Sequence, residues 1–405
     1  MPKKTIRDLN LKDRRVFIRV DYNVPLKKGV IGDDTRIRET LATIDFARKA
    51  GARCIVLASH LGRPKGKPNP EMSLAPVATR LAELLNSGTP GPAGPGEVTF
   101  ASDCIGAPAE DAVNAAPAGS IVLLENLRFH PEEEKNDEGF ARSLARLADV
   151  YVNDAFGAAH RAHASVEALV RLMPEAGAGL LMEKELRYLG EALGNPGRPF
   201  VAILGGAKGS DKIEVIDNLV PRVDRLLIGG AMAYTFFKAM GKPTGKSLVE
   251  DDKLESAREI MRAAAARKLQ LLLPTDHVVA PKLEAGVPSE VLSVDDGAIG
   301  ERMGLDIGPA TARAFADALR DAKTVVWNGP MGVFEIPDFA TGTVAVAKAV
   351  ADVNGTTIVG GGDSIAAVKA AGVTNRITHI STGGGASLEF LGGQTLPGVA
   401  VLPDK

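Results

Sequence analysis

The sequence predicts an α/β protein built from two doubly wound parallel-sheet domains. The chain has 405 residues, more than one hydrophobic core usually organises. Short runs rich in Val, Ile and Leu alternate with longer helical patterns, as in parallel sheets that are covered by helices. Many of these runs end in polar or glycine-rich clusters, and ligands of open parallel sheets bind at the carboxyl ends of strands. Together these patterns predict two ligand-binding α/β domains.

In the first half, four apolar runs are expected to form strands, and a helical pattern at 36–51 follows the first of them. The expected strands are residues 15–20, 52–59, 120–126 and 149–154. Residues 90–96 form a Pro- and Gly-rich stretch that we expect to be a surface loop, because strand patterns continue on both sides of it.

In the second half, six apolar runs alternate with helical patterns in the same way. The expected strands are residues 199–206, 225–230, 269–276, 324–329, 357–362 and 378–383. Between the halves, residues 173–199 begin and end with Pro and Gly and carry one amphipathic helix. We therefore predict a linker helix there, with the first domain ending near residue 175.

Composition limits the class of function. The net charge is -2, from 48 basic and 50 acidic residues, so the chain as a whole has no attraction to nucleic acid or to anionic membranes. The charged start lacks the apolar segment of a signal peptide, and no stretch of about 18 uncharged apolar residues occurs, so we expect a cytoplasmic protein. Cys54 and Cys104 have no paired metal spacing, and we expect reduced thiols in or near the core.

Basic side chains gather at strand ends and nearby loops of the first half. A single Arg in such a place is usually a solvated charge, but a recurring set favours convergence on one anion, because the Arg fork donates two hydrogen bonds at once. Asp21 and Asn23 are placed to hold hydroxyl groups of the same ligand. We give less weight to His130 and His163. The recurring set is Arg19, Arg36, His60, Arg63, Arg128, His160 and Arg161.

The second half offers backbone instead of side chains at its strand ends. Glycines at 205, 206, 229, 230, 360–362 and 383–385 would let a phosphate chain or a flat base approach the main chain. Lys208 and Lys212 add positive charge, and Asp363 follows three glycines at the start of a helical pattern. Asp363 is either a helix N-cap or a ligand of phosphate-bound magnesium, and we favour the magnesium role. His277 and His379 lie within or beside apolar runs, which indicates a core role.

In order along nearly the whole chain, these motifs resemble those of the phosphoglycerate kinase family. The matching segments include RVDYNVP, DDTRI, SHLGRP, ENLRFH, NDAFGAAHRAHAS, GGAKGSDKI, GGAMAYTFFKA, GLDIGP, WNGPMGVFE, GGGDS and STGGGASLEFL. The resemblance implies two Rossmann-like domains facing across a cleft and joined by a linker helix. The N-terminal domain, 1–175 with about 393–405 returning to it, would bind 3-phosphoglycerate or 1,3-bisphosphoglycerate. The C-terminal domain, 176–392, would bind ADP or ATP with Mg²⁺.

The resemblance also implies roles for individual residues. The substrate pocket would consist of Asp21, Asn23, Arg36, His60, Arg63, Arg128, His160 and Arg161. The nucleotide would be bound by Gly206, Lys208, Lys212, Gly229, Gly230, Gly304, Gly308, Asn328, Pro330, Val333, Glu335, Gly361, Gly362, Asp363 and Ser364. Within these, Glu335 would hold the ribose and Asp363 the metal. The catalytic groups would be Arg36, Lys208, Gly361 and Gly384. Gly209 and Gly392 depart from the family pattern.

The implied reaction is reversible phosphoryl transfer between 1,3-bisphosphoglycerate and ADP, giving 3-phosphoglycerate and ATP in glycolysis and gluconeogenesis. Because the acceptor carboxylate of 3-phosphoglycerate is already ionised, with a reference pKa of about 3.5 to 4, the reaction needs no general base. It does need domain closure to bring the two ligands in line. The resemblance favours a monomer that acts on small molecules.

Two alternatives belong to other classes of protein. One is a non-catalytic two-domain protein that closes on a phosphorylated ligand. The separate nucleotide features count against this alternative. The other is a dinucleotide-dependent oxidoreductase, which requires GxGxxG after a strand. The glycines at 205, 206 and 209 do not meet that pattern.

Overall fold

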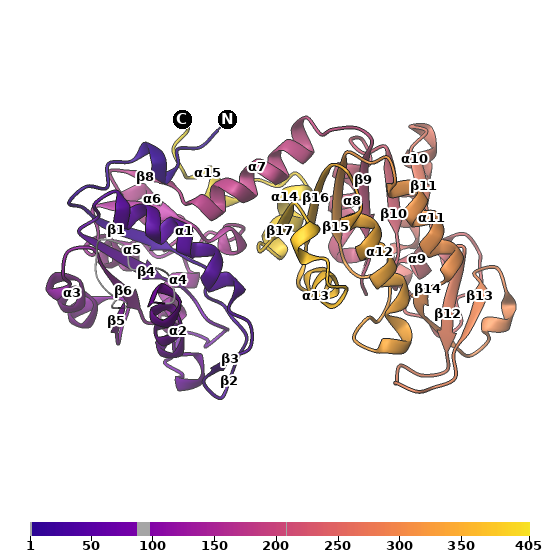
Figure 1. Cartoon of the computed structure of the whole chain (residues 1–405), viewed down its shortest axis with the longest axis horizontal. Helices are drawn as coiled ribbons and strands as arrows, with labels where there is room; N and C mark the ends of the chain where they lie inside the picture. Colours follow the sequence, from indigo (N-terminus) through magenta and orange to yellow (C-terminus); the bar gives the residue numbers. More distant parts are fainter. Residues whose placement is uncertain (1, 87–97, 208) are drawn as a thin grey trace. The chain divides into compact units, whose positions relative to one another are not determined.

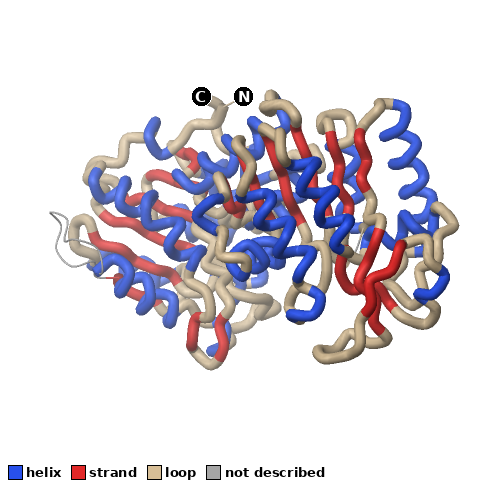
Figure 2. Tube along the Cα trace, turned by 45° about the vertical axis from the view of Figure 1, so that its right-hand side comes forward, coloured by secondary structure: helices blue, strands red, loops and turns tan. Residues whose placement is uncertain are grey.

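The computed structural model describes residues 2–86, 98–207 and 209–405. The chain divides into two compact units, residues 1–186 with 395–405, and residues 187–394. The boundary between residues 186 and 187 falls within helix α7 (Leu180–Gly194). This helix lies inside the segment where a linker helix was expected. Each unit contains a six-stranded parallel sheet with helices packed over it, so the predicted fold class is confirmed (Figures 1 and 2). The expected loop at 90–96 and Lys208 lie outside the described residues.

The sheet of the first unit has the strand order β5-β6-β4-β1-β7-β8, and every neighbouring pair is parallel. Every residue of β4 is buried, because helices cover both faces of a doubly wound sheet. β5 and β8 were missed by sequence analysis. The strands are β1 (Arg15–Arg19), β4 (Cys54–Ala58), β5 (Val98–Ala101), β6 (Ser120–Leu124), β7 (Val150–Asn153) and β8 (Ala176–Ala178), with a hairpin of β2 (Leu26–Lys27) and β3 (Val30–Ile31) beside them.

The helices of the first unit pack an apolar face onto this sheet. In α5, Phe140 and Leu144 are buried one turn apart, and the side chain of Asp137 caps the helix by accepting a hydrogen bond from the Phe140 N–H. The helices are α1 (Thr35–Lys49), α2 (Ala75–Asn86), α3 (Gly106–Ala115), α4 (Pro131–Glu134), α5 (Glu138–Ala145), α6 (Ala168–Leu172) and α15 (Pro397–Ala400), with 3-10 turns η1 (Ile6–Asp8), η2 (Pro70–Met72), η3 (Leu127–Phe129) and η4 (Phe156–Ala158).

The two ends of the chain lie side by side in the first unit (Figure 1). Lys3 and Asp404 form an antiparallel bridge, and their side chains form an ion pair of 2.9 Å. Helix α15, which precedes Asp404 in the chain, is hydrogen-bonded to β7 and to the loop after it. The Gly398 N–H donates to the carbonyl of Ala159, and Asn153 donates its side-chain N–H to the Gly398 carbonyl. The C-terminal segment therefore supports the loop that carries His160.

The large sheet of the second unit has the order β11-β10-β9-β15-β16-β17 and is also parallel throughout. The chain starts in the middle at β9, winds outward to β11, and later returns to the other side of β9 as β15. Ligands of such sheets bind where the winding direction changes, here between β9 and β15. The strands are β9 (Phe200–Leu204), β10 (Arg225–Ile228), β11 (Gln270–Leu272), β15 (Thr324–Asn328), β16 (Thr356–Gly360) and β17 (His379–Ser381).

A second, antiparallel sheet in this unit was not anticipated. The run 269–276 was expected to form one strand, but the chain leaves the parallel sheet after β11 and begins β12 at Asp276. Pro274 separates the two, and proline donates no ladder hydrogen bond. This sheet has the order β13-β12-β14, formed by β12 (Asp276–Ala280), β13 (Glu290–Ser293) and β14 (Met303–Ile307).

Helices cover both sides of the parallel sheet in the second unit (Figure 2). Each helix of the described residues is too short or too polar to cross a bilayer. The helices are α8 (Ile213–Leu219), α9 (Met232–Ala239), α10 (Leu254–Ala266), α11 (Pro309–Leu319), α12 (Thr341–Ala351), α13 (Gly362–Ala370) and α14 (Gly385–Leu391), with 3-10 turns η5 (Ser210–Lys212), η6 (Asp251–Lys253), η7 (Gly297–Ile299), η8 (Pro337–Phe339) and η9 (Thr374–Arg376).

Candidate active site

In the first unit, the loop after β1 and the first turn of α1 are joined through Arg36. Its Nη1 donates to Oδ2 of Asp21 at 2.8 Å and to the Asn23 carbonyl at 3.3 Å. Asn23 Oδ1 in turn accepts a hydrogen bond from the Gly62 N–H at 2.9 Å. The loops that follow β1 and β4 are therefore held together at the carboxyl edge of the sheet.

His60 is buried beside Arg19, the last residue of β1. Arg19 Nη2 lies 3.1 Å from Nδ1 of His60, and its Nε donates to the Ser165 hydroxyl at 2.8 Å. Burial, and then the positive charges of Arg19, Arg128 and Arg36, hold the pKa of His60 well below its usual value. His60 is therefore neutral near pH 7.

Buried Glu133 compensates part of the charge of Arg19. Its Oε1 lies 4.0 Å from Arg19 Nη2, and both of its oxygens accept hydrogen bonds from Ser165. Burial raises the pKa of Glu133, while Arg19 and Ser165 act in the opposite direction. Sequence analysis missed Glu133, because the acidic run EEE that contains it looks like an ordinary exposed helix start.

Arg128 reaches the loop after β4 from η3. Its Nη1 donates to the Gly62 carbonyl at 2.9 Å, and its Nε lies 3.5 Å from a carboxylate oxygen of Glu134. That Nε is buried but makes no hydrogen bond within the described residues. Burial lowers the pKa of Arg128 from its usual value, but a guanidinium stays charged in proteins. It retains a donor for a ligand oxygen.

The remaining basic residues of the predicted pocket are more exposed. Arg161 Nε donates to Nε2 of the neighbouring His160 at 3.1 Å, and Arg63 lies exposed on the loop after β4. The adjacent His163 is buried, and burial together with Arg128, Arg19, Arg161 and His160 lowers its pKa to about 3. Since Arg19, Arg128, Arg161 and His160 all act on the pKa of His163, these residues occupy one region of the first unit.

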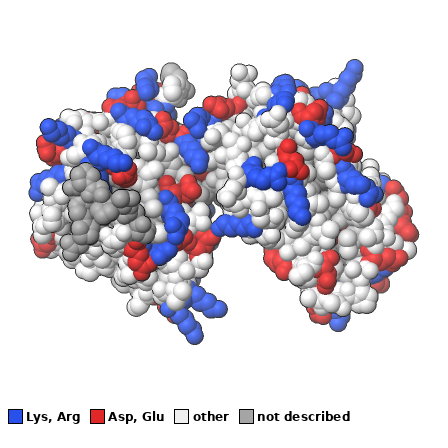
Figure 3. All heavy atoms as spheres, in the orientation of Figure 1, with Lys and Arg blue, Asp and Glu red and all other residues white. Residues whose placement is uncertain are grey.

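This concentration of charge is local. On the face drawn in Figure 3, basic and acidic side chains are interspersed over the surface. Around His60 and His163, in contrast, burial is the largest cause of the lowered pKa values, and several positive neighbours lower them further. Such a cluster is stabilised by a bound anion, and guanidinium forks suit phosphate and carboxylate groups.

In the second unit, a pocket of about 200 Å³ opens at the switch point between β9 and β15. Its edge is formed by backbone: the Gly206 N–H donates to the Pro330 carbonyl at 2.8 Å. A side chain at Gly230 would place its Cβ 2.5 Å from the backbone nitrogen of Gly206, so glycine is required for this close approach. Seven of the predicted nucleotide residues line the pocket, namely Gly206, Gly230, Gly304, Pro330, Val333, Glu335 and Asp363.

Three side chains deep in this pocket were not predicted. The Tyr234 hydroxyl lies 2.8 Å from Nδ1 of His277, and the two rings are stacked. Burial lowers the pKa of His277 to about 4, and its Nε2 has no hydrogen-bond partner within the described residues. Burial also raises the pKa of Asp306 to about 7. His277 is buried, as expected of a core residue, but it also lines the pocket.

Two helix N-termini follow β16 and β17, and the first of them reaches the pocket lining through Asp363. Gly361, with a φ of 90°, is the N-cap of α13, and Gly384 is the N-cap of α14. Ser364 in the first turn of α13 accepts a hydrogen bond from the Gly329 N–H. The side-chain nitrogen of Asn328 is buried without a hydrogen-bond partner in the described residues. Unpaired N–H groups in such positions suit phosphate oxygens.

Asp363 is not the N-cap of α13, because Gly361 occupies that position. Asp363 is exposed in the first turn, lines the pocket, and forms no hydrogen bond or ion pair with the described residues. A carboxylate is a ligand that Mg²⁺ prefers, usually together with phosphate oxygens and water. The residues present therefore fit a magnesium ion that arrives with a nucleotide.

Other predicted nucleotide residues lie away from the pocket lining. Gly308 is the N-cap of α11 and packs against Asp276, whose carboxylate accepts hydrogen bonds from the first turn of that helix. Gly229 packs against Met331. Buried Lys212 extends its Nζ toward Gly206. Lys208 lies outside the described residues.

Glu250 was missed by sequence analysis and anchors the glycine-rich loop after β9. Its Oε2 accepts hydrogen bonds from the N–H groups of Gly209 at 2.6 Å and Ser210 at 3.1 Å. Gly209 and Gly392 have φ values of -78° and -70°, which any residue adopts. The backbone conformation therefore does not require glycine at either of these two positions.

Comparisons with known proteins agree with this geometry. A family model described as phosphoglycerate kinase matches residues 6–394. Curated relatives named phosphoglycerate kinase include one from Solibacter usitatus, 60% identical over 98% of both chains, and one from Koribacter versatilis, 56% identical over 100% of both. The solved phosphoglycerate kinase of Coxiella burnetii is 40% identical, with a TM-score of 0.87 over 99% of this chain and 98% of its own. That of Pyrococcus horikoshii is 33% identical, with a TM-score of 0.84 over 98% of both chains.

Proposed function

The chain belongs to the phosphoglycerate kinase family, and from that premise we propose how its two units share the reaction. The enzyme transfers a phosphoryl group reversibly between 1,3-bisphosphoglycerate and ADP, giving 3-phosphoglycerate and ATP, in glycolysis and gluconeogenesis. The observation that carries this function is the match of the family model to residues 6–394. It excludes the non-catalytic binding protein and the dinucleotide-dependent oxidoreductase.

In this proposal the basic cluster of the first unit binds the phosphoglycerate. The exposed guanidiniums of Arg63 and Arg161, together with Arg128, bind its phosphate and carboxylate oxygens. Asp21 and Asn23 hold its hydroxyl group. His60 and His160 serve in binding rather than proton transfer, and the pKa of His60, held well below neutral, supports a role as a neutral hydrogen-bond donor.

The second unit binds the nucleotide in this proposal. The glycine edge at Gly206 and Gly230 takes the base, Glu335 the ribose, and the loops after β15 and β16 the phosphates. The side-chain nitrogen of Asn328 supports the assignment of the phosphates to these loops, because it is a buried donor without a hydrogen-bond partner in the described residues. A Mg²⁺ ion held by Asp363 with the nucleotide would neutralise phosphate charge.

Catalysis then depends on position and charge. Arg36, Lys208 and the main-chain N–H groups of Gly361 and Gly384 neutralise the migrating phosphoryl group. The acceptor carboxylate is ionised near neutral pH, so the protein supplies no general base. Because the ligands are assigned to different units, we propose that a hinge closure brings them in line and excludes water, which would otherwise compete as acceptor.

We also propose that the enzyme acts as a monomer in the cytoplasm. Its glycolytic role and two free, buried cysteines favour a reducing compartment. A coupled assay that follows ADP formation tests the function: product should appear only when 3-phosphoglycerate and MgATP are both present. Folded protein without such turnover would overturn the assignment. Light scattering during size-exclusion chromatography gives the oligomeric state.

A further inference from the structure

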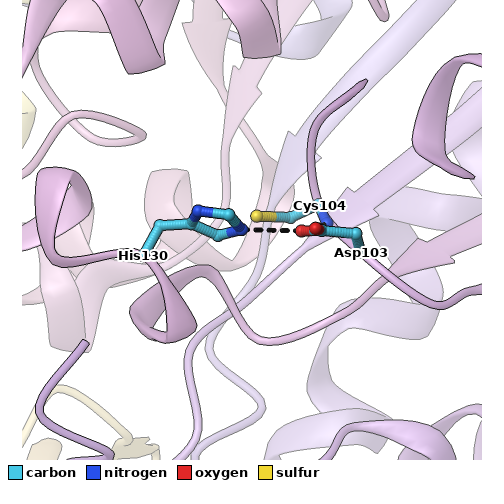
Figure 4. Close-up of side chains that lie close together, drawn as sticks. All are labelled: Asp103, Cys104 and His130. Atoms are coloured by element: carbon cyan, nitrogen blue, oxygen red, sulfur yellow. Dashed lines mark hydrogen bonds and ion pairs between the residues drawn. The ribbon is translucent and has the colours of Figure 1, made fainter. Parts of the chain in front are cut away.

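We propose that Asp103, Cys104 and His130 form a binding site for a divalent metal cation of the zinc type, outside the residues assigned to phosphoglycerate or nucleotide. The Asp103 carboxylate, the Cys104 sulfur and the His130 imidazole offer three ligand atoms that all lie within 4.8 Å of one another. Figure 4 shows the three side chains converging from two segments of the first unit.

The sheet topology brings these residues together. β5 and β6 are neighbouring parallel strands, so the segments that follow them emerge at the same edge of the sheet. Asp103 and Cys104 follow β5, and His130 follows η3, the turn after β6. The two segments are distant in sequence, which is why the spacing of the cysteines indicated no metal site.

The three ligand atoms lie near enough to one another for one ion to reach all of them. A tetrahedral Zn²⁺ with bonds of about 2.3 Å to sulfur and about 2.0 Å to nitrogen and oxygen separates its ligand atoms by about 3.3 to 3.5 Å. Nε2 of His130 lies 2.7 Å from Oδ1 of Asp103, and the sulfur lies within 4.8 Å of both. On binding, the carboxylate and the imidazole must move apart from their present 2.7 Å contact.

The charges of the ligands match a divalent ion. Without a cation, Oδ1 of Asp103 accepts a hydrogen bond from the Cys104 backbone N–H at 2.6 Å and lies 2.7 Å from Nε2 of His130. Binding breaks the S–H bond, forms a metal–sulfur bond and releases one proton to solvent. One thiolate and one carboxylate then neutralise the two positive charges. Thiolate with imidazole favours zinc-type ions over Mg²⁺ or Ca²⁺.

The site has an entry route and a link to the substrate pocket. Cys104 is fully buried, but the side chains of Asp103 and His130 are 39% and 27% exposed, so an ion and one water ligand reach them from outside. His130 directly precedes α4, which carries Glu133, and Arg128 lies two residues before it. A bound ion therefore fixes the junction that positions these two residues and stabilises the first unit.

The test titrates the full-length, nucleotide-free protein with Zn²⁺ in competition with a chromophoric chelator. Wild type is compared with Cys104→Ser, Asp103→Asn and the matched control Cys54→Ser, which removes a buried thiol from β4. We expect affinity to fall at least about tenfold in Cys104→Ser and Asp103→Asn and to stay unchanged in Cys54→Ser. A cation held at Asp363 would be retained in all variants, so the difference isolates this site.

Cobalt provides an independent readout. The Co²⁺ complexes of wild type and Cys54→Ser should show a thiolate-to-metal charge-transfer band that Cys104→Ser lacks. Equal Zn²⁺ affinity of wild type and Cys104→Ser, or the absence of this band from wild type, would overturn the proposal. If Cys104→Ser does not fold, the partly exposed Asp103→Asn decides the question, because unchanged Zn²⁺ affinity in that variant also contradicts the site.

Discussion

Nη2 of Arg19 lies 3.1 Å from Nδ1 of His60 inside the first unit. A guanidinium only donates hydrogen bonds, so Nδ1 is the acceptor and the imidazole proton is on Nε2. Burial and the surrounding arginines hold the pKa of His60 well below its usual value. This contact therefore fixes both the charge and the tautomer of a predicted substrate ligand.

The first prediction follows from that contact. Nitrogen NMR of the labelled protein should find His60 as the neutral Nε2–H tautomer near pH 6.5, the pH at which an exposed histidine is about half protonated. His130, which is partly exposed, provides an internal comparison of signal quality. An imidazolium signal from His60 at neutral pH would contradict the assigned hydrogen bond.

The second prediction concerns the anchor of the loop after β9. Glu250 accepts two backbone hydrogen bonds from Gly209 and Ser210, and Lys208 immediately precedes them in the chain. Hydrogen bonds to a charged group contribute about 1.5 to 3 kcal/mol each, so Glu250→Gln should lower kcat about tenfold or more with little change in KM for 3-phosphoglycerate. Exposed Glu259 on α10 is the control, and Glu259→Gln should retain wild-type kcat. Equal kcat in wild type and Glu250→Gln would remove Glu250 from this positioning role.

The third prediction is a pH dependence of stability from Asp306. Burial raises its pKa from 3.8 to about 7, so between about pH 4 and 7 the folded protein retains a proton that the unfolded chain has lost. Stability from this group therefore falls as the pH rises through that window, by at most about 1.4 kcal/mol per pH unit. Urea unfolding of wild type and Asp306→Asn checks this: wild type should lose stability relative to the variant from pH 4 to 7. A difference in unfolding free energy between wild type and Asp306→Asn that does not change with pH would contradict the raised pKa of Asp306.

The fourth prediction concerns the C-terminal helix. A Cβ at Gly398 would lie 2.5 Å from Val166 Cγ1 and 3.0 Å from Ala159 Cα, and Ala159 directly precedes His160. Gly398→Val should displace the loop and raise KM for 3-phosphoglycerate, with little effect on KM for ATP. Gly190 has open space around it, so Gly190→Ala is the matched control. Unchanged KM for 3-phosphoglycerate in Gly398→Val would contradict a role of α15 in supporting the substrate pocket.

The sequence predicted the parallel sheets well, because strands buried on both faces read as continuous apolar runs such as β4 and β9. It missed the antiparallel sheet, because β11 and the start of β12 together look like one run until Pro274 is recognised as a break. Contacts between distant segments were not accessible. Cys104 meets His130 because the neighbouring strands β5 and β6 end at one edge, and Tyr234 on α9 meets His277 near the start of β12 in the antiparallel sheet.

The central claim is that phosphoglycerate binds through the first unit and nucleotide through the second. Calorimetric titration of wild type, Arg63→Ala and Asn328→Ala with 3-phosphoglycerate and with MgADP tests it most directly. Arg63 is exposed, so its removal should leave folding intact while weakening 3-phosphoglycerate binding about tenfold and leaving MgADP affinity unchanged. Asn328→Ala should show the opposite pattern. Unchanged 3-phosphoglycerate affinity in Arg63→Ala, or equal weakening of both ligands by either substitution, would contradict the division.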